Sequence, residues 1–277
     1  MKALLLGATG HLGRLLLAAL RDHESRGLSH RDVDVRDRAA VAKAVGDFSP
    51  DAVILAAGLA SADFCEDHPG DAYAVNVDGA RNAAEASRGR AFVHFSTDHV
   101  FDGKSGPYSE DDPPAPISVY GRTKLESERI VTAVNPRSLV IRTSLVWSAT
   151  GRSFFTALRD AKAPMPCWID HFGTYTYGPN LVEAVVELLE RGFAGLWNVA
   201  GPGVLNRHEF ALKVAARFGL DASLFKPVSI RDAPPRAPRP LRAGLRVEKA
   251  QAALRTRLLP ADEALALISP GTSPGTR

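Results

Sequence analysis

Cysteine is scarce in this sequence, and nothing in its composition marks an unusual protein. The 277 residues include two cysteines, Cys65 and Cys167, which are too few for a disulfide framework. We expect both to be small apolar packing residues of a protein in a reducing compartment. Hydrophobic residues make up 45% and charged residues 23% of the chain, a balance that excludes a mostly disordered protein.

The chain also lacks a strong excess of one charge and a long apolar run. Lys and Arg number 34 against 31 Asp and Glu, so the net charge is +3 and the dense basic stripe of a nucleic-acid binder is missing. Glycines and charges interrupt the apolar start, which leaves no signal-peptide core. No run of about 18 apolar residues is present to span a membrane. These absences predict a cytoplasmic protein that binds neither nucleic acid nor membranes.

Short apolar segments alternate with helical patterns through the first half of the chain. The predicted strands are 2–6, 52–57, 91–96 and 138–143, with a further one near 27–30. The helical patterns between them cover 12–21, 73–87 and 119–134. This alternation indicates a parallel sheet covered on both faces, which is the doubly wound α/β arrangement of a Rossmann fold.

The second half is less regular. It has helical patterns at 154–161, 181–191 and 207–218, a strand-like segment at 196–200, and a Pro- and Arg-rich stretch, expected to be non-helical, at 231–246. We predict a dinucleotide-binding Rossmann domain over 1–150 and a small, mainly substrate-binding lobe over 151–268. Elements of about 178–200 are expected to return to the sheet. The low-complexity end, 269–277, is expected to be disordered.

A glycine-rich loop follows the first predicted strand and opens the first helix. In its sequence, GATGHLG, Gly7, Gly10 and Gly13 permit a tight turn and let the backbone approach a pyrophosphate. The N–H groups at the start of the helix then face the phosphates. A dinucleotide is the expected ligand; the alternative is a glycine-rich turn that binds nothing.

The segment after the second strand selects between the two nicotinamide dinucleotides. An acidic residue there binds the ribose 2′-hydroxyl, whereas an arginine accepts a 2′-phosphate. Here Arg31, Asp32 and Asp34 stand together. We therefore expect NADPH or NADH, with NADPH slightly favoured because of Arg31. A solvated loop charge would explain Arg31 equally well.

Tyr120 and Lys124 stand four residues apart, on one face of a predicted helix. A nearby cation lowers the pKa of a phenol from about 10, which prepares it to protonate a carbonyl oxygen. Ser96 and Thr97 end the preceding strand, at the edge where ligands bind in such sheets. The order of glycine loop, hydroxyl pair and Tyr-x-x-x-Lys is more specific than any one of these motifs.

In this order the motifs resemble those of the extended short-chain dehydrogenase/reductases and, within them, the dTDP-4-dehydrorhamnose reductase-like family. The segments that carry the resemblance are GATGHLG, DVDVRD, LAAGLASADFCEDHP, NVDGARNAA, HFSTDHVFDG, SVYGRTK, IRTSLVW, IDHFGTYT and GLWNVAGPG. The resemblance implies an NAD(P)H-dependent oxidoreductase that transfers a hydride to the keto group of a nucleotide-linked deoxy sugar. It is also compatible with a homodimer.

Carried over position by position, the resemblance implies roles for single residues. Tyr120 becomes the proton donor, Lys124 its electrostatic partner, and Thr97 the hydroxyl that polarises the sugar carbonyl. The implied cofactor-binding residues are Gly7, Gly10, His11, Leu12, Gly13, Asp34, Val35, Ala56, Ala57, Gly58, Tyr120, Lys124 and Thr143. The implied substrate-binding residues are Ser96, Thr97, His99, Val100 and Leu145.

The sequence departs from the family pattern on the sugar side. His99 stands where the family has a tyrosine, and Leu145 where it has a tryptophan. We therefore predict that the best substrate is a keto sugar other than dTDP-4-dehydrorhamnose. Two alternatives stay open, namely an NAD-dependent nucleotide-sugar epimerase and a non-catalytic dinucleotide-binding regulatory subunit.

Other polar residues have plainer interpretations. His94 is expected to be a packed histidine within its strand. Glu66, Asp67 and His68 stand together without a second pair of ligands at metal spacing, so no metal site is predicted. The stretch 231–246 offers arginines whose planar forks suit the nucleotide diphosphate, although a solvated linker is equally consistent. These arginines are Arg236, Arg239 and Arg242.

Overall fold

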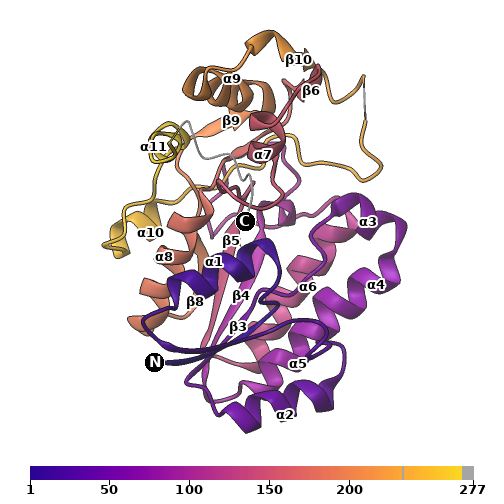
Figure 1. Cartoon of the computed structure of the whole chain (residues 1–277). Helices are drawn as coiled ribbons and strands as arrows, with labels where there is room; N and C mark the ends of the chain where they lie inside the picture. Colours follow the sequence, from indigo (N-terminus) through magenta and orange to yellow (C-terminus); the bar gives the residue numbers. More distant parts are fainter. Residues whose placement is uncertain (233, 270–277) are drawn as a thin grey trace.

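The computed structural model describes residues 1–232 and 234–269, and its centre is a six-stranded parallel sheet (Figure 1). In spatial order the strands are β2 (Glu24–Leu28), β1 (Lys2–Leu6), β3 (Ala52–Leu55), β4 (Ala91–Thr97), β5 (Ser138–Thr143) and β8 (Gly195–Asn198). Every neighbouring pair in this sheet is parallel. The chain order reverses between β1 and β3, which makes this the switch point where doubly wound sheets bind ligands. The predicted fold class is confirmed.

Helices bury both faces of this sheet. Leu5 of β1 packs with Leu16 of α1 (His11–Ala19) and with α8 (Gly178–Glu190). Leu4 and Leu6 turn the other way, into a cluster with Val41 of α2 (Arg38–Phe48) and with α5 (Gly79–Ala86). The long helix α6 (Val119–Val134) lies beside α5 on that face (Figure 1). Because both faces are covered, the strands are continuous apolar runs.

One predicted helix, 73–87, has a more complex course. The chain passes from α3 (Ala62–Asp67) through α4 (Pro69–Tyr73) into a π-helical turn, η1 (Ala74–Asp78), before α5 begins. Such turns are rare and are frequent at functional sites. This one brings Asn76, which is 2% exposed, against the loop that follows β3. Helix α2, which the Asp37 carboxylate caps, was not predicted from the sequence.

The second half of the chain builds two small sheets and a core of its own at one end of the large sheet (Figure 1). β6 (Met165–Trp168) pairs with β10 (Phe225–Val228), and β7 (Phe172–Thr174) with β9 (Val204–Asn206). The remaining elements are η2 (Asp98–Val100), α7 (Phe154–Arg159), α9 (Arg207–Phe218), η3 (Ala222–Leu224), α10 (Glu248–Ala253) and α11 (Ala261–Ala266).

Two predictions for this half depend on which residues are described. The stretch 231–246 holds no helix in its described part, as predicted. The end 269–277, predicted to be disordered, lies outside the described residues except for Ser269. Across the two described ranges, none of the helices combines the length and the apolarity that crossing a bilayer requires.

Candidate active site

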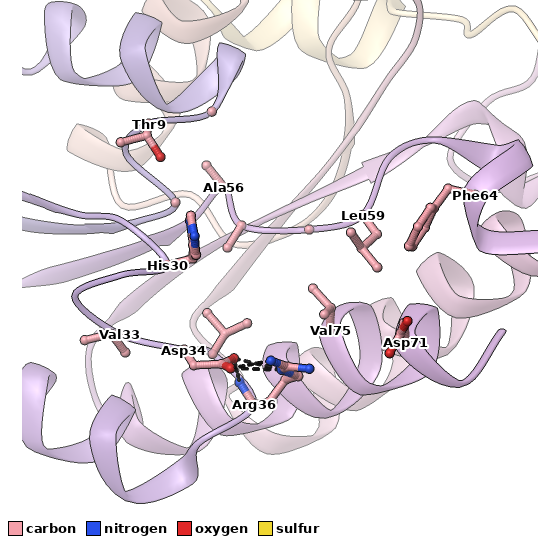
Figure 2. A pocket seen from close by; sticks show the side chains of 15 residues that line it. Thr9, His30, Val33, Asp34, Arg36, Ala56, Leu59, Phe64, Asp71 and Val75 are labelled. Atoms are coloured by element: carbon pink, nitrogen blue, oxygen red, sulfur yellow. Dashed lines mark hydrogen bonds and ion pairs between the residues drawn. The ribbon is translucent and has the colours of Figure 1, made fainter. Parts of the chain in front are cut away.

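The glycine-rich loop connects β1 to α1 beside a cavity of about 500 Å³ (Figure 2). Two of its glycines are required by the fold: a Cβ on Gly7 would lie 2.4 Å from the Ala57 nitrogen, and one on Gly13 would lie 2.2 Å from the Gly7 oxygen. Gly10 differs, because a Cβ there would stay 3.4 Å from its nearest neighbour, the same Gly7 oxygen. Gly10 lines the cavity and begins α1 without a side-chain cap. The absence of a side chain at Gly10 therefore keeps the cavity open and is not required by the packing of the loop.

The loop after β3 forms another wall of the cavity. Ala56, Ala57 and Gly58 line it, as does Val35. Asn76 fixes the next residue of the loop, since its Oδ1 accepts from the Leu59 nitrogen at 2.8 Å and its Nδ2 donates to the Leu59 oxygen at 3.0 Å. The same Nδ2 lies 3.1 Å from the Thr123 hydroxyl of α6. Asn76 thus ties this wall to the helix of Tyr120, a role not predicted from the sequence.

A pair of opposite charges occupies one end of the cavity. The Arg36 guanidinium binds both oxygens of the Asp34 carboxylate, with Nε 3.0 Å from Oδ1 and Nη2 2.6 Å from Oδ2 (Figure 2). This contact lowers the pKa of Asp34. Arg31, on which the preference for NADPH rested, is exposed and lies outside the cavity lining. The basic side chain of the cavity is Arg36 instead.

The structure brings the three predicted catalytic residues together. Thr97 ends β4, and Tyr120 and Lys124 occupy the first two turns of α6. The start of this helix is fixed by the Ser118 hydroxyl, its N-cap, and by the Glu66 carboxylate, which accepts its first N–H at 2.9 Å. Thr97 lies beside the Tyr120 phenol and lowers its pKa.

The electrostatics of Tyr120 differ from the sequence-based prediction. Burial raises its pKa above the ordinary value of a phenol, Thr97 opposes this, and the Asp98 carboxylate adds to the rise. The predicted lowering by Lys124 is not found: Lys124 is not among the groups that shift the pKa of Tyr120, and desolvation of the phenolate raises that pKa. Tyr120 is therefore a neutral phenol, the form that can donate a proton.

Lys124, on the next turn of α6, is buried and contacts His94. Its Nζ lies 3.3 Å from the His94 Nε2, which is also 2.9 Å from the Ser127 hydroxyl. Burial lowers the pKa of Lys124 to about 8, and Glu128, one turn further along α6, opposes that shift. His94 is a packed strand residue, as predicted, but it also positions the lysine.

Two predicted substrate contacts point away from the site. Ser96 donates its hydroxyl hydrogen bond to Glu128, which also holds the buried Arg142 guanidinium at 2.7 and 2.9 Å. Successive side chains of a strand project from opposite faces, so Ser96 and Thr97 cannot serve one ligand. Val100 is fully buried in the apolar core. Both assignments to the substrate are corrected to structural roles.

The remaining predicted cofactor residues lie around the same loop. His11 is half-buried, with its Nε2 3.5 Å from the Ser148 hydroxyl, and burial lowers its pKa. Leu12 is partly buried and packs against the core. Thr143 ends β5 and is paired in register with Thr97. Within the described chain, no three His, Cys, Asp or Glu side chains are grouped as metal ligands.

On the other side of Tyr120 lies a group of histidines and arginines. The His99 ring meets the Tyr120 ring edge to face, with centroids 5.4 Å apart. The Nδ1 atoms of His99 and His171 are buried and have no hydrogen-bond partner among the described residues. Burial, followed by the positive charges of Arg207 and Arg239, lowers the pKa of both histidines to about 3. Both imidazoles are therefore uncharged near neutral pH.

The arginines of this group come from separate segments. Arg207 begins α9 and stacks over Trp168, with its guanidinium carbon 4.4 Å from the ring centre. Arg239 is partly buried, with 11% of its side chain exposed, and pairs with Asp63 at 2.9 Å. The other two candidates of the Arg-rich stretch are more exposed: Arg236 pairs with Asp67, and Arg242 lies over the Phe172 ring. Arg207 and His171 were not identified from the sequence, although His171 lies in IDHFGTYT, one of the segments that carry the family resemblance.

Leu145 closes this region against the second small sheet. It adopts a left-handed conformation with φ 41°, which is unusual for a leucine. Its Cδ1 would lie 2.8 Å from a Cβ on Gly173, so that glycine leaves room for the leucine side chain. Strained residues of this kind cluster at ligand sites.

The fold and the site define an extended short-chain dehydrogenase/reductase. The chain belongs to the family described as the RmlD substrate binding domain, which it matches over residues 1–269. The dTDP-4-dehydrorhamnose reductase of Aggregatibacter actinomycetemcomitans is 32% identical over 91% of this chain and 92% of its own. The probable low-salt glycan biosynthesis reductase Agl14 of Haloferax volcanii is 32% identical over 92% of each chain.

A solved structure supports the same assignment. The dTDP-4-dehydrorhamnose reductase of Bacillus anthracis, in complex with NADP, superposes with a TM-score of 0.92 at 26% identity, over 96% of this chain and 98% of that one. A UDP-glucose 4-epimerase of Thermus thermophilus has a TM-score of 0.80 at 21% identity, which shows a shared fold alone. The predicted family and the NAD(P)H-dependent reductase class are confirmed.

Proposed function

We propose that this protein is an NADPH-dependent reductase that transfers a hydride to the keto group of a nucleotide-linked deoxy sugar. One observation carries the proposal: Thr97, Tyr120 and Lys124 meet at the carboxyl end of the sheet, beside a cavity lined by the glycine loop. The reductases among the relatives, named for dTDP-4-dehydrorhamnose, support the class of substrate.

The lining of the cavity fits the adenosine and pyrophosphate part of a nicotinamide dinucleotide, which would supply the hydride when bound. Gly10 leaves open the place where a pyrophosphate must approach the start of α1. Lys124 would hold the ribose next to the nicotinamide. Arg36 and His30, which line the far end, offer donors to a 2′-phosphate. The NADP complex of the Bacillus anthracis reductase also favours NADPH.

The side chains of this protein supply the proton and the electrostatic support. Tyr120 gives its phenolic proton to the oxygen of the reduced carbonyl, and the Thr97 hydroxyl supports the same oxygen. The phenolate that remains is unfavourable, because desolvation raises the pKa of Tyr120. The Lys124 ammonium, on the next turn of α6, stabilises that phenolate during the transfer.

The histidine and arginine group would bind the substrate. Arg207 and Arg239 are suited to the diphosphate, since guanidinium forks match phosphate oxygens. His99 and His171 present uncharged ring nitrogens that can bond to sugar hydroxyls. His99 and Leu145 replace aromatic residues of the family, so we expect a keto sugar other than dTDP-4-dehydrorhamnose to be the best substrate.

The test is NADPH oxidation with a panel of 4-keto nucleotide sugars, with the product identified by NMR. Steady oxidation with at least one sugar is the expected result. A changed sugar configuration without net oxidation would indicate an epimerase. Tight NADPH binding without turnover of any sugar would indicate a regulatory subunit.

Three further predictions belong to this proposal. They are a domain boundary near residue 150, a homodimer, and a cytoplasmic location. The two cysteines are free and buried, which suits a reducing compartment. Light scattering coupled to gel filtration measures the oligomeric state, and limited proteolysis of the chain locates the boundary.

A further inference from the structure

The described part of the Pro- and Arg-rich stretch 231–246 is docked against the half of the chain that builds the large sheet. It begins just after β10 and runs towards α3 (Figure 1). The Ala237 N–H donates to Oδ1 of Asp63 at 2.9 Å, and the Arg242 N–H donates to the Gly103 oxygen at 2.9 Å. Ala237 is fully buried, although both of its neighbours in the chain are exposed. The stretch is therefore a docked segment and not a solvated linker.

Asp63 of α3 holds this segment at two points. While its Oδ1 accepts from the Ala237 N–H, its Oδ2 accepts from Nη2 of Arg239 at 2.9 Å. The Nη1 of Arg239 donates in turn to the Ala237 oxygen at 3.0 Å. The Asp63 side chain is 31% exposed, so this ion pair is partly sheltered and is screened less by salt than an exposed pair. One carboxylate thus fixes both the backbone at 237 and the guanidinium at 239.

The helix that carries Asp63 is itself tied to the helix of Tyr120. Glu66, one turn further along α3, accepts from the Val119 N–H, the first of α6, at 2.9 Å. Cys65 is fully buried in a small apolar cluster with Val119, against which Tyr120 packs. These contacts fix Asp63, and through it Arg239, relative to the proton donor.

Arg239 keeps donors for a ligand in this arrangement. A guanidinium has five N–H donors, and the two contacts with Asp63 and Ala237 use two of them. Burial raises the pKa of Asp63, but the hydrogen bond from Ala237 and the charge of Arg239 lower it further, so the carboxylate is ionised near neutral pH. Arg207, the other arginine proposed for the diphosphate, is held by the rings of Phe154 and Trp168 instead.

We infer, on the basis of the proposed function, that Asp63 is a positioning residue for the nucleotide sugar. It holds Arg239 in the orientation in which the remaining N–H donors meet the diphosphate. A long side chain loses rotamer freedom when it binds a ligand, and a partner that orders it beforehand removes that cost. Loss of Asp63 should therefore weaken binding of the nucleotide sugar through Arg239 and leave dinucleotide binding and the reacting groups unaffected.

Asp63→Asn is the first test, because an amide oxygen can still accept from the Ala237 N–H but the charge that holds Arg239 is lost. Calorimetry with dTDP and with UDP, in the presence of NADP⁺, measures affinity for the diphosphate. For whichever of the two binds wild type, we expect affinity to fall about 10-fold, the upper range for ordering one side chain. Asp67→Asn is the matched control on the same helix, since its pair with Arg236 is exposed, and should change little.

The opposite result would overturn the inference. If Asp63 competes with the diphosphate for Arg239, Asp63→Asn will bind dTDP or UDP as tightly as wild type or more tightly. In either case Asp63 does not prepare Arg239 for the ligand.

A double variant separates positioning from a general structural role. Arg239→Met removes the guanidinium and should weaken diphosphate binding by about 10- to 100-fold. If Asp63 acts through Arg239, Asp63→Asn combined with Arg239→Met should bind no more weakly than Arg239→Met alone. Additive losses would show that Asp63 supports the site in some other way, and would overturn the inference.

Kinetics give a further readout, with the best sugar of the panel. In Asp63→Asn, KM should rise about 10-fold while kcat stays within about twofold, because Thr97, Tyr120 and Lys124 are untouched. The NADPH Kd should also stay within about twofold. A loss of kcat at unchanged KM would overturn the inference.

Hydrogen exchange of the protein without substrate tests the contact itself. The Ala237 amide should be protected in wild type and in Asp63→Asn, and should exchange faster in Asp63→Ala, which removes its acceptor. Rapid exchange of this amide in wild-type protein would overturn the inference. Failure of the proposed function would appear elsewhere, as wild-type protein that binds neither dTDP nor UDP and oxidises NADPH with no sugar.

Discussion

The two sides of this site are built from different kinds of structure. The glycine loop, Thr97 and Tyr120 are held by β1, β4 and α6, elements of the large sheet and its covering helices. Arg207 comes instead from the start of α9, directly after the short strand β9, His171 from the turn before β7, and Arg239 from the irregular stretch 231–246. Chemistry that needs exact geometry lies on rigid elements, while recognition lies on segments that tolerate change. The departures from the family pattern, His99 and Leu145, accordingly face the second side.

The largest effect on activity is expected at Tyr120, which is held by a helix that covers the large sheet. Tyr120→Phe removes the proton donor but keeps the ring that packs against His99. We expect kcat to fall by about 10²–10⁴-fold, with NADPH affinity unchanged in fluorescence titrations. Tyr73→Phe, on the exposed side of α4, is the control and should keep full activity. Normal turnover by Tyr120→Phe would remove this residue from the mechanism.

Two glycines of one loop should behave differently. Gly10 has an ordinary φ of −67°, so Gly10→Val should keep the fold in circular dichroism while a side chain occupies the pyrophosphate position. Calorimetry should show dinucleotide affinity reduced by about 100-fold or more, the loss of roughly two charge-assisted hydrogen bonds. Gly13→Ala should lower Tm instead, because its Cβ meets the Gly7 oxygen. Retained binding in Gly10→Val would make the loop a simple turn.

Arg207 tests the recognition side. Arg207→Met keeps an unbranched apolar chain against Trp168 but removes the guanidinium, so KM for the nucleotide sugar should rise about 10- to 100-fold. The kcat at saturation should change much less, because the reacting atoms are held by Thr97, Tyr120 and Lys124. Arg236→Met, which removes an exposed arginine paired with Asp67, is the control. An equal loss of kcat and of affinity would show that the two sides are not separable.

A smaller effect is expected at the adenosine end of the cavity. Arg36→Ala should lower the preference for NADPH over NADH by about tenfold, close to one charge-assisted contact with the 2′-phosphate. NADH should lose little, since Asp34 is then free to accept from a ribose hydroxyl. Arg31→Ala is the matched control. A loss of the preference for NADPH in Arg31→Ala, and not in Arg36→Ala, would show that Arg31 selects the cofactor, as the sequence predicted. Kd values for both dinucleotides decide the matter.

The same contrast explains what the sequence could predict. β1, β5, α6 and α9 begin and end where the apolar patterns placed them, since each buries a long, regular face. The small strands β6 and β9 span three or four residues and depend on pairing with distant segments, so no local pattern marks them. The π-helical turn η1 could not be predicted, because the helical pattern of the sequence continues on either side of it.

The residues of the site also differ in whether the sequence could predict them. The glycine loop and Tyr120 follow from spacing alone, because the sheet places strand ends and helix starts together. Ser96 was assigned wrongly although the alternation of a strand separates it from Thr97. The pKa of Tyr120 needed the three-dimensional burial that a spacing of four residues does not contain. Arg207 could not be predicted, because only the three-dimensional fold places the start of α9 near His99 and His171.

The smallest effect concerns the choice of sugar. It tests whether the residues that recognise the substrate can be changed without affecting the glycine loop, Thr97 and Tyr120. His99→Tyr combined with Leu145→Trp restores two aromatic surfaces, which add flat packing area against a sugar ring. The double variant should shift the ratio of kcat/KM values towards dTDP-4-dehydrorhamnose by several-fold to about tenfold, the low end for pocket contacts of this size. Leu145 already adopts a left-handed conformation beside Gly173, so the tryptophan must turn away from that glycine, and Tm should be measured alongside. Leu212→Trp, on the exposed face of α9, adds the same ring outside the site and should leave the ratio unchanged. An unaltered ratio in the double variant would show that the neighbouring loops, and not these two positions, shape the sugar pocket.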